Sequence, residues 1–180
     1  MKLQNNTRIS DSVIRRVLSR AFREVGAKSG DVFVQVNQAT RNGCRGTAFN
    51  CDLVRWGRGR KPIACKGAFR ITMPKAMGKD DVHIACGCLS LKDYGPLGRA
   101  ERFYHVAAHE AAHIRDYQHP EDKQAWSHRR NGRRPAHDER PEECRANSRA
   151  ADATDNQERH FDAIYALAVE LENQMENTHD

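Results

Sequence analysis

The sequence lacks the features that mark membrane-spanning and secreted proteins. It has no run of about 18 apolar residues, the length that a membrane-spanning helix needs, and only 38% of its 180 residues are hydrophobic. Its first residues, MKLQNNTRISDSVIRR, contain no apolar segment like that of a secretory signal. We therefore expect a cytoplasmic protein with no membrane partner.

The sequence also lacks internal repeats, coiled-coil heptads and low-complexity tracts, which argues against repeat and fibrous architectures. A chain of 180 residues is long enough for one domain with a core and short for two. The formal net charge is +6, with a pI near 9.1. This charge is compatible with a nucleic-acid partner, but the 24 acidic residues among the basic ones also fit an ordinary solvated surface.

No two of the six cysteines have the CxxC spacing of zinc fingers and ribbons. Cytoplasmic cysteines are mostly reduced, so a disulfide framework is not expected. Two interpretations remain, namely small buried apolar residues or a structural zinc ion. The candidate ligands for such an ion are Cys44, Cys51, Cys65 and Cys86 or Cys88.

The pattern of apolar residues predicts an α+β fold in a single domain. Apolar residues recur at helical spacing in SDSVIRRVLSRAFREVG, whereas DVFVQVNQ alternates as a strand does. We expect a small, mainly antiparallel sheet, because no crossover helix separates the strands that follow residue 31. The expected order in residues 1–180 is a helix at 10–26, a sheet region at 31–91, a helix at 99–118, a basic loop at 119–140 and helices at 141–176.

The helix at 99–118 carries the motif HEAAH, which has the form HExxH. Residues four apart lie one helical turn apart, so His109 and His113 can bind one metal ion. Neutral imidazole suits zinc, and a catalytic zinc ion has three protein ligands and an open position for water. Glu110 lies beside that position and is the candidate general base for the attack of water on a carbonyl.

The third ligand has more than one candidate. In RPEECRANSRAAD, Glu143 shares a helical face with Ala146, Asn147, Ala150 and Ala151, which are small enough to press against the histidine helix. Glu142 instead shares its face with two arginines, so we favour Glu143 and keep Glu142 as an alternative. Asn147, one turn after Glu143, is a candidate hydrogen-bond partner for the site.

His119 is the other alternative, because HEAAHIRDYQH matches the metzincin pattern HExxHxxGxxH except that Asp116 replaces the glycine. Asp116 itself lies about 10 Å along the helix axis from His109, too far for both to bind one ion. We expect Asp116 to support the site or to pair with a loop arginine. His105 is expected to be a polar residue near the site.

The motif HEAAH, followed about thirty residues later by RPEECRAN, resembles the gluzincin-type zincins, in particular small metallopeptidases of phage and bacterial genomes. The resemblance covers residues 99–155. It implies a zincin-like minimal core in which His109, His113 and Glu143 bind Zn²⁺ and Glu110 is the base. It also implies an edge strand that aligns an extended substrate, for which DVHIACG and AFRITMP are the candidates.

This sequence departs from the thermolysin-like pattern in two ways. Asn147 stands where those enzymes have an aspartate, and their large substrate-binding lobe is missing. A second hydrogen-bond donor for the transition-state oxyanion is also expected, and nothing in the spacing selects one residue. The candidates are Tyr104, Tyr117, His128 and His160.

The sequence therefore predicts a zinc-dependent endopeptidase of narrow specificity that acts on a protein or peptide substrate. The alternative is a catalytically silent, zinc-stabilised protein that contacts nucleic acid through the basic loop. In that alternative the loop arginines contact phosphates and a tryptophan stacks on a base. The residues concerned are Trp126, Arg129, Arg130, Arg133 and Arg134.

Overall fold

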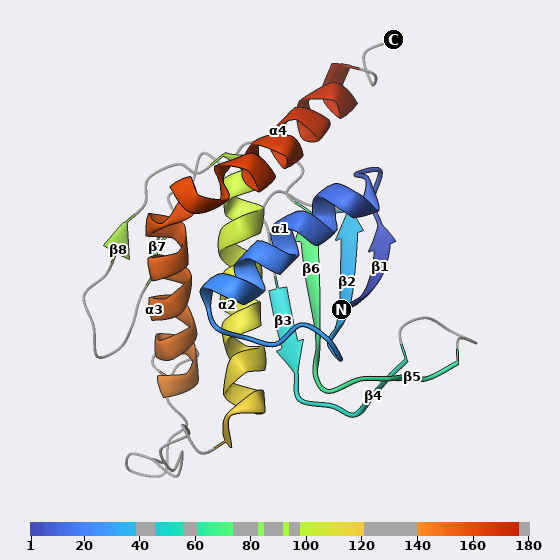
Figure 1. The fold of residues 1–180 in the computed structure, drawn as a ribbon, viewed down its shortest axis with the longest axis vertical. Coiled ribbons are helices and arrows are strands. Elements are labelled where there is room, and N and C mark those ends of the chain that lie inside the picture. Colours follow the sequence, from blue (N-terminus) through green and yellow to red (C-terminus); the bar gives the residue numbers. More distant parts are fainter. Residues whose placement is uncertain are drawn as a thin grey trace.

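The computed structural model describes residues 1–38, 46–55, 61–73, 83–84, 92–93, 98–120 and 140–176. Within these ranges the chain is a mixed α and β protein in which helices cover one face of a small sheet (Figure 1). The α+β class expected from the sequence is confirmed. The strands are β1 (Lys2–Asn6), β2 (Phe33–Gln38), β3 (Gly46–Phe49), β4 (Leu53–Val54), β5 (Ile63–Ala64), β6 (Ala68–Met73), β7 (His83–Ile84) and β8 (Lys92–Asp93). The helices are α1 (Asp11–Glu24), α2 (Arg99–Gln118), α3 (Pro141–Asp155), the short 3₁₀ helix η4 (Gln157–His160) and α4 (Phe161–Glu176).

The main sheet has the strand order β1-β2-β6-β3, and its first three strands are parallel. Only β3, at the edge, is antiparallel to its neighbour β6. The prediction of a mainly antiparallel sheet is therefore wrong for this sheet, although the ribbons β4–β5 and β7–β8 are antiparallel. One reason is β1, a polar strand that the pattern of apolar residues did not reveal, and the other is that β2 and β6 pair in parallel although only strands separate them in the described chain. Because β1 precedes α1, that helix is the crossover between two parallel strands.

The core lies between the sheet and the helices. α1 is amphipathic and buries an apolar stripe that includes Val17, Leu18 and Phe22. Phe22 stacks on Phe69 of β6, with ring centroids 5.7 Å apart. The same side of the sheet carries Ile71 and other buried residues of β2 and β6, whereas the opposite side holds polar pairs, such as Arg70 Nε donating to Gln35 at 2.9 Å.

α2 is the central helix of the structure. It packs against α1, α3, α4, β3 and β6, and its bounds are those expected from the sequence. α3 runs antiparallel beside it, and α4 crosses near the end at which α2 begins (Figure 1). In the part of the chain that the structure describes, no helix is both long and apolar enough to cross a membrane. Most of the basic loop, at 121–139, lies outside the described residues.

Candidate metal centre

α2 supplies two imidazoles to the centre from successive turns. The helix begins after Gly98, whose N–H donates to the Glu101 carboxylate at 2.7 Å. His109 and His113 point to the same side, with their rings edge to face and their centroids 4.8 Å apart. Their Nε2 atoms are 3.1 Å from each other. Local helix geometry alone therefore accounts for the histidine pair.

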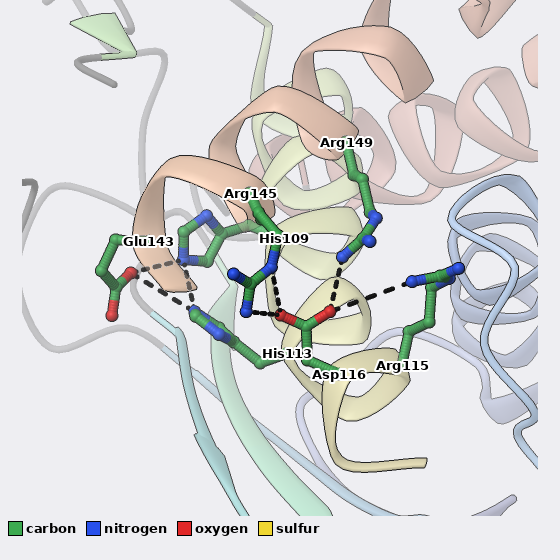
Figure 2. A network of polar contacts seen from close by, with 7 residues as sticks. All are labelled: His109, His113, Arg115, Asp116, Glu143, Arg145 and Arg149. Carbon is green, nitrogen blue, oxygen red and sulfur yellow. Dashed lines mark hydrogen bonds and ion pairs between the residues drawn. The ribbon is translucent and has the colours of Figure 1, made fainter. Parts of the chain in front are cut away.

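α3 brings the third group of the centre. Pro141 occupies the first turn of α3, where its missing N–H costs nothing. The small residues Ala146, Ala150 and Ala153 are buried between the helices and allow α3 to approach α2 closely. As a result Glu143 Oε2 lies 3.3 Å from Nε2 of both His109 and His113 (Figure 2).

These three residues can hold a metal ion. They are the only group of three or more potential ligands that converge within the described ranges, and their ligand atoms lie within 4.8 Å of one another. A tetrahedral ion with bonds of about 2.0–2.2 Å holds its ligand atoms roughly 3.3–3.6 Å apart. The separations of 3.1, 3.3 and 3.3 Å are close to that spacing. Two imidazoles and one carboxylate are also the donors that divalent transition metals prefer.

The electrostatics of Glu143 suit a ligand that must be deprotonated. Glu143 is 7% exposed. Burial by itself would raise the pKa of the carboxyl, but the hydrogen bonds from His109 and His113, together with their charges, outweigh it and lower the pKa. The anion is therefore held in place between the two imidazoles.

Glu110 lies on the same helix but turns toward the sheet. It is 4% exposed, and its carboxylate accepts a hydrogen bond from the backbone N–H of Ala48 in β3. Burial is the largest influence on the pKa of Glu110. Together with the charge of Glu143 it outweighs the lowering by His109 and the Ala48 N–H, and the net pKa is raised to about 7. Glu110 is not a member of the converging group.

Gly46 leaves room for the buried Glu110 side chain beside β3. Sequence patterns did not identify Gly46 as a residue of the site. A Cβ on Gly46 would lie only 2.6 Å from Glu110 Cδ and would also overlap the carboxylate oxygen Oε1. Only glycine fits between β3 and the carboxylate. A glycine at the start of a strand is a known sign of close approach, and this was the one signal available from the sequence.

Asp116 joins α2 to α3 rather than binding a metal. It accepts hydrogen bonds from Arg145 Nη2 at 2.7 Å, Arg145 Nε at 3.0 Å and Arg149 Nη1 at 2.6 Å (Figure 2). Its side chain is 5% exposed. Burial raises the pKa of Asp116, but the two arginines outweigh it, so the net shift is downward. The expected arginine partner is thus on α3 and not in the loop, and the arginine face of α3 is turned toward α2 rather than toward water.

The other candidates take different places. Glu142 and His119 are half-buried and stay outside the converging group. His105 is buried, and its Nδ1 lies 2.7 Å from the hydroxyl of Thr154, which donates to the Ala150 carbonyl. Burial, aided by His109, lowers the pKa of His105 to about 4, so it is neutral. Asn147 follows Glu143 by one turn, and its role as an orienting residue stays a prediction.

Two of the candidate oxyanion donors, Tyr104 and His160, contact each other. Tyr104 is fully buried with its ring centroid 5.6 Å from that of His160, whose Nε2 is 2.7 Å from Glu24 Oε2. Tyr117 follows His113 by one turn of α2. Burial raises the pKa of Tyr117 to about 12, and Glu110 and Glu143 are the next contributors, which places it in their field. His128 lies outside the described residues.

The edge strand also differs from the expectation. AFRITMP forms β6, which is paired on both sides, and the described part of DVHIACG is β7 in a separate ribbon. The strand beside the centre is β3. The loop residues proposed to contact nucleic acid lie outside the described residues; these are Trp126, Arg129, Arg130, Arg133 and Arg134.

We expect Glu143→Ala to weaken the binding of a divalent cation by more than the roughly 10–100-fold that follows loss of an orienting residue. Titration calorimetry of the metal-free protein with Zn²⁺ measures this. Glu142→Ala and His119→Ala are the matched controls and should bind as the wild type does. Equal binding by Glu143→Ala would mean that another group is the third ligand.

We expect Asp116→Asn to destabilise the fold by roughly 2–3 kcal/mol at pH 7, because it leaves two arginines without their anion. Asp162→Asn is the control, since the Asp162–Arg20 pair at 3.5 Å is largely exposed. The pKa of Asp116 is lowered on folding, so its contribution is present above the ordinary value of 3.8 and is lost at more acidic pH. Urea unfolding at several pH values measures both effects, and similar losses for the two variants would contradict the expectation.

Comparison with protein-family models, with curated proteins and with solved structures finds no match for this chain.

Proposed function

We propose that this protein is a zinc-dependent endopeptidase of the gluzincin type. The observation that carries the proposal is the convergence of His109, His113 and Glu143 from two helices, with Glu110 buried beside them. Zinc fits this donor set of two nitrogens and one carboxylate oxygen. In such a site the ion lowers the pKa of a water to about 7 and polarises a carbonyl.

Glu110 is the group proposed to accept the proton of the attacking water. Its position next to His109 in the sequence places its carboxylate near the ligands without making it one of them. The Ala48 N–H and the close contact with Gly46 hold the carboxylate in one orientation. A base restrained in this way needs no reorganisation when the reaction begins.

Substrate alignment is assigned to β3. It is the outer strand of the described main sheet, bonded to β6 on one side, and its Ala48 N–H donates to Glu110. An extended peptide can add to such an edge through main-chain hydrogen bonds. Because Gly46 and Ala48 of β3 contact Glu110, a peptide bond of a peptide added to β3 would lie close to Glu110, the proposed base. Among the described candidates, Tyr117 is proposed as the second oxyanion donor, because Glu110 and Glu143 contribute, after burial, to its raised pKa.

The proposal is tested with zinc-loaded wild type and Glu110→Gln on unfolded casein and a peptide library. Glutamine keeps the shape of the side chain but cannot accept the proton, so kcat/KM should fall by about 10²–10⁴-fold. Zinc content should stay unchanged. Glu172→Gln, an exposed change on α4, is the control and should keep full activity.

Wild-type protein that binds zinc and cleaves no peptide would overturn the proposal. In that case the catalytically silent, zinc-stabilised binding protein becomes the better reading. Equal activity of the wild type and Glu110→Gln would exclude Glu110 as the base while leaving hydrolysis itself established.

We also expect Gly46→Ala to lower kcat/KM by at least about tenfold, because a small displacement of a catalytic group has a large effect on rate. Zinc content should not change, since Gly46 does not touch the ligands. Gly30→Ala is the matched control, because a Cβ there meets nothing within 4 Å. A Gly46→Ala variant as active as the wild type would show that Glu110 works without its contact with β3.

A further inference from the structure

Two cysteines flank the ribbon β4–β5, which lies below the main sheet in Figure 1. Cys51 precedes β4 by two residues, and Cys65 directly follows β5. Cys51 Sγ and Cys65 Sγ are 3.8 Å apart. Cys65 is 6% exposed and belongs to a small apolar cluster with Phe33, Val54 and Ala68. Cys51 is half-buried at the margin of that cluster. Neither thiol takes part in the proposed hydrolysis.

Backbone hydrogen bonds hold the two cysteines side by side. The Cys65 N–H donates to the Asp52 carbonyl at 2.9 Å, and the Gly67 N–H donates to the Cys51 carbonyl at 2.9 Å. The Cys65 thiol also donates to the Cys51 carbonyl at 3.4 Å. The sulfur atoms are therefore kept in contact by an antiparallel pairing that does not depend on a covalent bond.

We propose that Cys51 and Cys65 are a redox-sensitive pair that a small-molecule disulfide, such as oxidised glutathione, converts to an intramolecular disulfide. A disulfide has an S–S length of about 2.05 Å. The two Sγ atoms, 3.8 Å apart, therefore need to approach each other by less than about 2 Å. Side-chain rotation on a paired backbone supplies a movement of that size.

The exchange proceeds in two steps. Cys51 loses its proton and its sulfur attacks the small disulfide, which forms a mixed disulfide and releases one small thiol that carries the proton. Cys65 then loses its proton and attacks Cys51 Sγ, which forms the Cys51–Cys65 bond and releases the second small thiol. Two protein thiols are oxidised, and one small disulfide is reduced to two thiols.

Exposure sets the order of the steps. Cys51 is the more accessible sulfur, whereas burial, followed by the hydrogen bond and charge of Cys51, raises the pKa of Cys65 to about 11. A thiol with a raised pKa is a poor first nucleophile. Once Cys51 is in the mixed disulfide, its thiol no longer opposes ionisation of Cys65, and the two sulfurs are already adjacent.

The experiment treats the full-length protein with oxidised glutathione and maps the peptides under non-reducing conditions by mass spectrometry. The peptide with Cys51 should be linked to the peptide with Cys65, with a mass lower by two hydrogen atoms, and dithiothreitol should reverse the link. Oxidation should also raise the melting temperature, because the link restricts the unfolded chain.

Two variants separate the roles of the sulfurs. Cys65→Ser should retain glutathione on Cys51, because no second thiol displaces it, whereas Cys51→Ser should leave Cys65 unmodified. Cys144→Ser is the control, and the link should form in it as in the wild type. A different partner for Cys51, or no link at all, would overturn the proposal. A zinc content of two ions per chain that falls to one in Cys51→Ser would also overturn it, since the pair would then hold a second metal ion.

Discussion

The close antiparallel contact between α2 and α3 is the constraint on which the rest of the centre depends. Alanines at the interface let the helix backbones approach, and Asp116 fixes their register through Arg145 and Arg149. Since Glu143 precedes Arg145 by two residues, the same register sets the carboxylate between the imidazoles. Such an ion pair adds little net stability compared with packed apolar residues, although removal of one partner alone is costly. Its geometry disfavours sliding of one helix past the other. The main effect of this ion pair is to fix the register of α2 and α3 rather than to add to the free energy of folding.

The second constraint is the contact between α2 and the edge strand. Glu110 stays buried and unligated because β3 offers it a backbone N–H and a position without a side chain. Two different carboxylate environments therefore meet at one site, Glu110 from α2 and Glu143 from α3. Glu143 is stabilised as an anion by the imidazoles, while burial raises the proton affinity of Glu110. Environments that push two carboxyl groups apart in pKa are typical of sites in which one group binds and the other moves a proton.

The cysteine pair belongs to a separate part of the structure. Its small apolar cluster, with Phe33 and Ala68, lies on the side of the sheet away from the main core. Cys51 nevertheless follows the end of β3 by two residues, and β3 contacts Glu110. A covalent link at Cys51 would therefore restrain the strand that contacts Glu110. Through this one short strand, the proposed redox chemistry of the pair would reach the candidate metal centre.

Features that depend on local spacing could be predicted from the sequence. They are the bounds of α2, the histidine pair one turn apart, and the small-residue face of α3 that carries Glu143. Helical periodicity specifies these, because it relates residues four positions apart. Three features became known only from the folded chain: Glu143 rather than Glu142 or His119 joins the histidines, β1 and β6 both pair in parallel with β2, and Gly46 lies against Glu110. Each of these is a contact between residues far apart in the chain. The residues of β1 are too polar to show the alternating pattern that predicts a strand. Packing of the whole core determines which surfaces meet, and local sequence patterns do not predict it.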